Sequence, residues 1–96
     1  MISAMTLDAR QRKALVGRSH PLKPMVYVGR HGVKAEQIET IRAHFRKTDL
    51  VKVKIDADDG DAAEAIARSI VEQVPCDLVA RRGHVAILHS DAGMSE

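Results

Sequence analysis

The sequence contains very few aromatic side chains: one tyrosine, one phenylalanine and no tryptophan. The core must therefore consist mainly of aliphatic side chains, and hydrophobic residues make up 45% of the chain, which is ordinary for a folded globular domain. Recognition of nucleic acid by stacking several bases on aromatic platforms requires more aromatic residues than this. The composition therefore disfavours that mechanism.

Paired cysteines and long apolar segments are also absent from the sequence. The single cysteine, Cys76, cannot form an intramolecular disulfide, and its apolar neighbours favour a buried thiol in a reducing compartment. No stretch approaches the roughly 20 apolar residues of a membrane span, and the first residues do not resemble a signal peptide. We therefore expect a cytoplasmic protein with no membrane partner.

Acidic residues are scarce in the first part of the chain, and basic residues are scarce in the second. Residues 1–55 carry twelve Lys and Arg against four acidic residues, whereas residues 56–96 carry three Arg against nine acidic residues. The basic half indicates a surface for a polyanion, and the acidic half indicates a separate surface. Chance clustering of solvated side chains is the simpler alternative. With 96 residues, the chain is long enough for one domain with one modest core.

Apolar periodicity and helix-breaking residues predict an alternation of helices and strands. The helices are expected at 7–16, 33–47 and 61–74, and the strands at 25–28, 50–55, 77–81 and 84–88. Thr6 is the expected N-cap of the first helix and Gly17 its expected end. The order α-β-α-β-α-β-β predicts an α/β fold with a single four-stranded mixed sheet packed by helices.

The segment 50–55 alternates between apolar and basic residues. Val51, Val53 and Ile55 share one side of the expected strand, while Lys52 and Lys54 share the other. This pattern predicts a half-buried strand whose open face is basic.

A short loop with two glycines, Gly29-Arg30-His31-Gly32, lies between an expected strand and an expected helix. Glycines permit tight backbone conformations and let a phosphate approach main-chain N–H groups, and a helix N-terminus also favours phosphate. Such a tetrapeptide is often only structural. Its position and the neighbouring Lys34 favour a phosphate-binding role, like the glycine loop of KH domains.

Other chemical motifs are missing. Val33 follows the second glycine where a P-loop requires lysine, and the third glycine of a dinucleotide fingerprint is absent. The acidic turn at 56–61 does not fit an EF-hand, because Asp61 and Ala67 occupy the positions of the required glycine and glutamate. The five histidines lack zinc-site spacing, and no nucleophile–base pair is recognisable. We expect no enzymatic activity, no cofactor and no metal.

Three segments in order resemble the CRM domain, named for chloroplast RNA splicing and ribosome maturation. They are HPLKP at 20–24, VGRHGV at 28–33 and DLVKVK at 49–54. The chain is similar to the stand-alone, bacterial YhbY-like form of this domain over residues 6–90, which leaves 1–5 and 91–96 as expected flexible termini. The resemblance implies a fold similar to the C-terminal domain of translation initiation factor three, with an added N-terminal helix. It also implies association with precursors of the large ribosomal subunit.

Together, the resemblance, the loop and the basic half predict a monomeric RNA-binding protein whose partner is ribosomal RNA. The expected RNA-binding residues are the loop, its neighbouring lysine, the two strand lysines and four further cations: Gly29, Arg30, His31, Gly32, Lys34, Lys52, Lys54, Lys23, Arg10, Arg12 and Lys13. The alternative is a protein-interaction module of the translation machinery that acts through the acidic C-terminal half.

Overall fold

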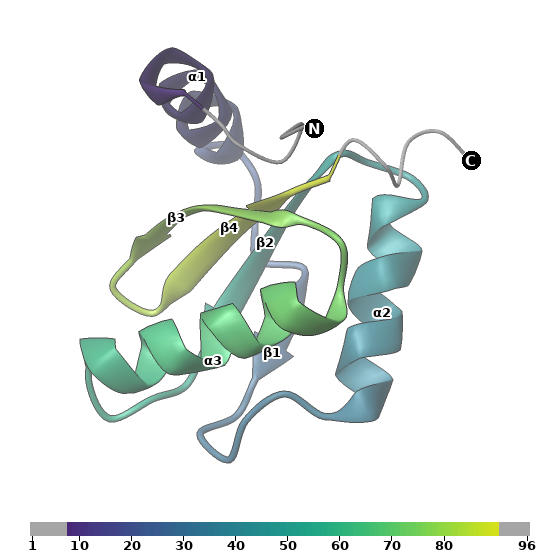
Figure 1. Ribbon diagram of the computed structural model, residues 1–96, viewed down its shortest axis with the longest axis vertical. Helices are drawn as coiled ribbons and strands as arrows, with labels where there is room; N and C mark the ends of the chain where they lie inside the picture. The colour runs from purple at the N-terminus through teal and green to yellow at the C-terminus, as the bar shows by residue number, and fades with distance from the viewer. Residues whose placement is uncertain (1–7, 91–96) are drawn as a thin grey trace.

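The computed structural model describes residues 8–90, which form the predicted succession of helices and strands (Figure 1). In chain order the elements are α1 (Ala9–Ser19), β1 (Val26–Val28), α2 (Ala35–Phe45), β2 (Leu50–Ile55), α3 (Gly60–Gln73), β3 (Asp77–Arg82) and β4 (Val85–His89). The predicted α/β fold class is confirmed. The expected flexible termini, 1–5 and 91–96, lie outside the described residues.

The four strands form one mixed sheet in the order β1-β2-β4-β3. Strands β1 and β2 are parallel, because α2 connects them by a crossover, whereas β2–β4 and β3–β4 are antiparallel. Gly83 closes the β3–β4 hairpin with φ +60°, a left-handed conformation that favours glycine. The register places Tyr27 beside Lys54, and Lys54 beside Val85.

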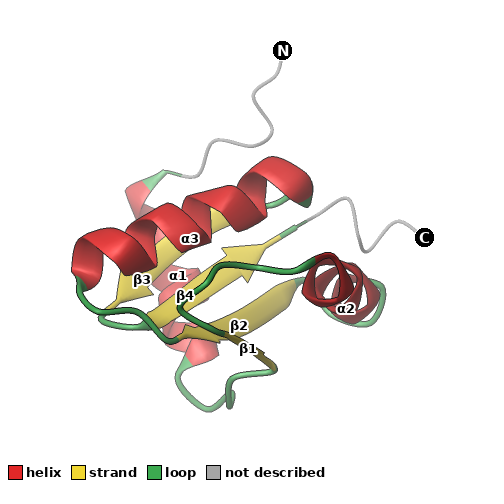
Figure 2. Ribbon diagram, turned by 90° about the horizontal axis from the view of Figure 1, so that it is seen from below, coloured by secondary structure: helices red, strands yellow, loops and turns green. Residues whose placement is uncertain are grey.

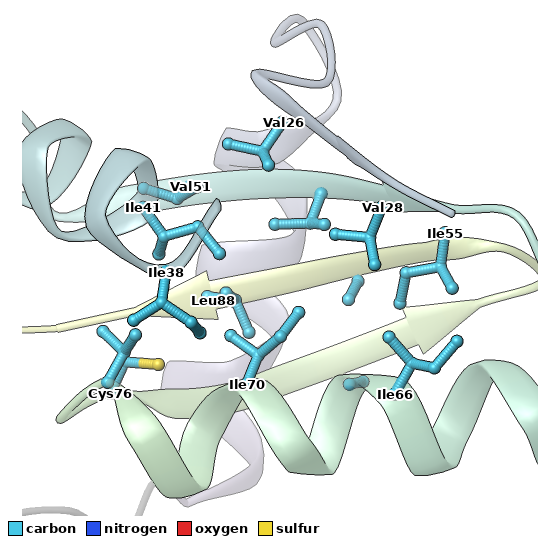
Figure 3. Close-up of a cluster of buried hydrophobic side chains, with 14 of the residues drawn as sticks. Val26, Val28, Ile38, Ile41, Val51, Ile55, Ile66, Ile70, Cys76 and Leu88 are labelled. Atoms are coloured by element: carbon cyan, nitrogen blue, oxygen red, sulfur yellow. The ribbon is translucent and has the colours of Figure 1, made fainter. Parts of the chain in front are cut away.

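The main core lies between the sheet and the two helices α2 and α3. Apolar side chains of both helices and of the strands point toward one another there, as Figure 3 shows for Ile41, Ile70 and Leu88. As predicted, Val51 and Ile55 of β2 belong to this core and are fully buried. Aliphatic side chains therefore fill most of the interior on this face of the sheet, together with the ring of Phe45 and the thiol of Cys76.

Helix α1 packs on the opposite face of the sheet (Figure 2). Leu15 and Val16 of α1 form a second apolar cluster with Leu50, Val79 and Ile87 of three strands. The face that carries Lys52 and Lys54 is therefore not open along its whole length, in contrast to the prediction. A helix covers one end of it, because Leu50 extends the alternating pattern of β2 with an apolar side chain on that side.

The ends of α1 also differ from those predicted. The helix begins after Asp8, whose carboxylate accepts a hydrogen bond from the Gln11 N–H at 2.8 Å, so that Asp8 is the N-cap. The expected cap, Thr6, lies outside the described residues. The helix also continues past Gly17, because buried Val16 and Ser19 pack the last turn against the sheet.

Candidate functional site

The loop between β1 and α2 has an ordered backbone turn. The Gly32 N–H donates a hydrogen bond to the Gly29 carbonyl at 3.1 Å. Gly32 has φ +103°, a backbone conformation that favours glycine at this position. Gly29 has no positive φ, and a Cβ placed on it would meet no atom within 4 Å. The fold itself therefore does not require glycine at position 29.

Helix α2 begins differently from the two other described helices. Carboxylates of Asp8 and Asp59 cap α1 and α3, whereas the N-cap of α2 is Lys34, whose side chain makes no capping hydrogen bond. The Lys34 backbone N–H instead donates to Gln37 Oε1 at 2.8 Å. Glu36 in the first turn is exposed. The positive end of the α2 dipole therefore lacks an anionic N-cap and can attract phosphate.

Arg30, the central cation of the loop, pairs with carboxylates of the β2–α3 turn. Its guanidinium lies 3.2 Å from Asp58 Oδ1 and 3.8 Å from Asp56 Oδ1, and all three side chains are exposed. Exposed ion pairs of this kind contribute only about 0–1 kcal/mol, so phosphate can compete for the guanidinium. His31 and Lys34 are exposed beside it.

The two lysines of β2 have different surroundings. Lys52 is half-buried, and its Nζ donates hydrogen bonds to the Ser19 carbonyl at 3.2 Å and the Leu22 carbonyl at 3.1 Å. It therefore holds the C-terminal end of α1 against the sheet. Lys54 is exposed at the end of β2 that α1 does not cover. The structure thus separates two residues that the sequence pattern grouped together.

The remaining predicted cations lie on α1 or in the segment that connects it to β1. Figure 1 shows α1 and the loop after β1 at opposite ends of the molecule. Arg10 and Lys13 of α1 are exposed, as is Lys23 in the following loop. Arg12 donates from Nη1 to the Leu78 and Val79 carbonyls of β3, an edge strand, and so anchors α1. The α1 cations of the expected patch are therefore separated from the loop.

A hollow that the sequence did not predict adjoins the loop. Its volume is about 460 Å³, and its polar or aromatic lining comes from Tyr27, Lys54, Asp56 and His84, together with Gly29 of the loop. The Tyr27 side chain is 65% exposed. Period-two alternation between two buried valines was the signal that could have placed this ring on the same side as Lys54.

Cys76 is buried, as expected, and desolvation raises the pKa of its thiol to about 12. Such a thiol stays protonated and is not a candidate nucleophile. Within residues 8–90, no group of three or more His, Cys, Asp and Glu side chains is arranged to hold a metal ion. None of the helices in this part of the chain has the length and apolar character needed to cross a membrane.

The fold defines a small α/β domain with a mixed four-stranded sheet and a glycine-containing loop at one end. The chain belongs to the CRS1/YhbY (CRM) domain family, whose sequence profile matches residues 7–89. The resemblance inferred from the three sequence segments is therefore confirmed.

Two bacterial relatives and one solved structure are similar to most of the chain. The chain is 29% identical over 84 residues to a protein of Haemophilus influenzae named "RNA-binding protein", covering 88% of this chain and 85% of that protein. It is 28% identical over 90 residues to "Probable RNA-binding protein YqeI" of Bacillus subtilis, covering 90% of each. The solution structure of a hypothetical protein from Staphylococcus aureus has the same fold, with TM-score 0.80, 21% identity and 90% coverage of each chain.

Proposed function

We propose that this protein binds RNA through phosphate contacts at the loop 29–32 and the start of α2. Membership of the CRM family and the names of the two bacterial relatives support an RNA partner. The observation that carries the proposed site is Gly29. Its backbone conformation does not require glycine, and its surroundings leave room for a side chain. Close approach of a sugar-phosphate backbone, in contrast, would require glycine there.

The cations near the loop would supply the charge for this contact. His31, Lys34 and Lys54 are exposed around it, and Arg30 would exchange its exposed carboxylate partners for phosphate. Main-chain N–H groups at the start of α2 are the remaining donors. Such contacts position RNA without reading its bases.

The other predicted cations have two roles in this proposal. Arg10, Lys13 and Lys23 would extend the contact to longer RNA, since their side chains are exposed. Lys52 and Arg12 would act indirectly, because their hydrogen bonds to backbone carbonyls fix α1 on the sheet.

Binding of a labelled structured RNA, followed by fluorescence anisotropy between about 50 and 200 mM salt, tests this site. Affinity should fall steeply with salt, and Lys34→Ala should reduce the log–log slope by roughly 0.7 to 0.9, the contribution of one phosphate. Salt-independent binding would reject a phosphate grip.

A bulky residue at the loop tests the close approach of the backbone. Gly29→Leu should weaken RNA binding while the fold stays intact, because the new side chain enters open space. Ala65→Leu is the matched control, since it adds bulk to the exposed side of α3, away from the proposed contact. Equal affinity of both variants and the wild type would move the site off the loop.

We further propose that the RNA partner is ribosomal RNA in precursors of the large ribosomal subunit, bound by a cytoplasmic monomer. The ribosomal partner is what the CRM resemblance implies. Tagged protein should sediment with large-subunit precursors on a sucrose gradient, and the Gly29→Leu variant should be depleted from those fractions. Absence of the wild-type protein from them would refute the assembly role.

The alternative, an acidic protein-interaction surface, receives less support. Three of its acidic side chains are paired within residues 8–90. Asp56 and Asp58 lie 3.8 and 3.2 Å from Arg30, and Glu64 contacts Arg81 at 2.8 Å. Glu64 also lies 2.9 Å from Arg68. These contacts reduce the negative charge available to a protein partner.

A further inference from the structure

Tyr27 is a feature that a phosphate-binding loop does not explain. Its neighbours in β1, Val26 and Val28, are 5% and 1% exposed, whereas Tyr27 is 65% exposed and is the one large exposed hydrophobic side chain in the region 8–90. Burial therefore does not account for an aromatic ring at this position. Backbone contacts do not require it either, because Gln37 Nε2 hydrogen-bonds to the Tyr27 carbonyl and not to its ring.

The surroundings of Tyr27 combine an aromatic face with cationic and polar groups. Lys54 is its partner across the β1–β2 pair. His84 lies in the β3–β4 turn, and its carbonyl accepts from the Ile55 N–H at 2.7 Å. All three residues line the hollow of about 460 Å³, which lies within the roughly 300–1,000 Å³ typical of small-molecule sites. Gly29 lines the same hollow, so the loop and the ring form one continuous surface.

We propose that this hollow holds one unpaired base of the bound RNA, stacked on the Tyr27 ring. The proposal rests on the proposed function, since Lys54 and the adjacent loop would hold the phosphates that flank the base. Unpaired bases of loops and bulges stack on aromatic side chains in this way, whereas paired bases remain within their helix.

The hollow contains an acidic residue as well as cations. The cations suit phosphate, and the acidic residue suits a base. Asp56 lines the hollow, and its carboxylate can accept hydrogen bonds from exocyclic amino groups of a base. Arg30 lies 3.8 Å from this carboxylate, so its positive charge stays close to Asp56 when the guanidinium turns to phosphate. The scarcity of aromatic residues argues against a reader of several bases, and the structure places a single ring where one base can reach it.

Intrinsic fluorescence provides a direct test, because Tyr27 is the sole tyrosine and the chain has no tryptophan. An RNA hairpin with an unpaired loop should quench tyrosine emission in a saturable manner as its base stacks on the ring. A blunt, fully paired duplex of the same charge is the control and should bind with little quenching. Binding of both RNAs is followed independently by anisotropy of a label on the RNA.

Two substitutions separate stacking from other roles of the side chain. Tyr27→Leu keeps apolar bulk but removes the ring, and it should weaken hairpin binding by roughly tenfold to a hundredfold, in line with the effect of removing one stacked base. Tyr27→Phe keeps the ring and should bind nearly as the wild type does. Neither should change duplex binding, and both should fold normally because the ring is exposed.

The outcomes distinguish this inference from the proposed function. Wild-type binding to the hairpin without quenching, together with unchanged affinity of Tyr27→Leu, would overturn the base site and leave RNA binding intact. Equal weakening of hairpin and duplex binding in Tyr27→Leu would also overturn the assignment to an unpaired base. Failure of the wild type to bind either RNA would refute the proposed function, and the base site with it.

Discussion

Replacing Lys52 with methionine is expected to destabilise the fold instead of removing a direct RNA contact. The Lys52 Nζ donates to the carbonyls of Ser19 and Leu22 at 3.2 and 3.1 Å. Ser19 is the last residue of α1, and Leu22 lies in the segment that connects α1 to β1. Methionine preserves most of the apolar stem but donates no hydrogen bond. The end of α1 then loses a cation that is favourable at a helix C-terminus.

The size of the effect follows from the number and kind of bonds that are lost. A hydrogen bond to a charged group contributes roughly 1.5–3 kcal/mol when well shielded, and the half-buried position of Lys52 reduces this contribution. Because water can replace the ammonium at both carbonyls, we expect a total loss of about 1–2 kcal/mol in the free energy of unfolding. For a domain of this size, this corresponds to a fall in Tm of roughly 4–16 °C.

Lys54→Met is the matched control, because Lys54 occupies the same face of the same strand and is exposed. Urea unfolding should show a lower midpoint for Lys52→Met and an unchanged midpoint for Lys54→Met, while RNA anisotropy should show the weaker binding for Lys54→Met. If Lys52→Met retained full stability and lost RNA affinity as Lys54→Met does, our assignment of Lys52 as a structural residue would be refuted.

Three further predictions concern acid stability, the loop glycines and the buried thiol. A hydrogen bond from Arg18 lowers the pKa of Asp49, so the stability from this pair is present above the unfolded pKa of about 3.9 and is lost as pH falls through the lower folded value. Urea unfolding of Asp49→Asn should therefore show a smaller loss of stability on acidification than the wild type. An equal loss in both proteins would contradict this. Gly29→Ala should be neutral or stabilising by up to about 1 kcal/mol, whereas Gly32→Ala, with φ +103°, should cost about 1–3 kcal/mol; equal urea midpoints for the two variants would contradict the assigned backbone conformations. Cys76, with its pKa raised to about 12 by burial, should react with a thiol reagent at pH 8 only at the rate of unfolding; rapid reaction of the native protein would show an accessible thiol.

Local patterns predicted most of the fold. The alternation of Val51, Val53 and Ile55 identified the buried side of β2, because successive side chains of a strand point to opposite faces. The end of α1 was predicted wrongly, since Gly17 is a weak helix former and yet lies within the helix. Burial of Val16 and Ser19 outweighs that local preference, and such packing is not visible in the sequence of one helix.

The candidate site was only partly predictable for the same physical reason. The loop from Gly29 to Gly32 was recognisable because its residues are consecutive and its conformation is local. The pairing of Arg30 with Asp58 and the bonding of Lys52 to the Ser19 carbonyl join residues 28 and 33 positions apart. Contacts at such separations depend on how helices and strands pack, and side-chain type alone does not specify them.

The placement of the strand lysines and Tyr27 depends partly on the strand pattern and partly on tertiary packing. Period-two alternation places Lys52, Lys54 and Tyr27 on one side of the sheet once β1 and β2 are paired, and this much follows from the chain itself. Which part of that side remains open depends on α1, which packs over Leu50 and leaves the region of Tyr27 exposed. Only tertiary packing decides this, because the pattern of a strand reports its two faces but not which element covers each of them.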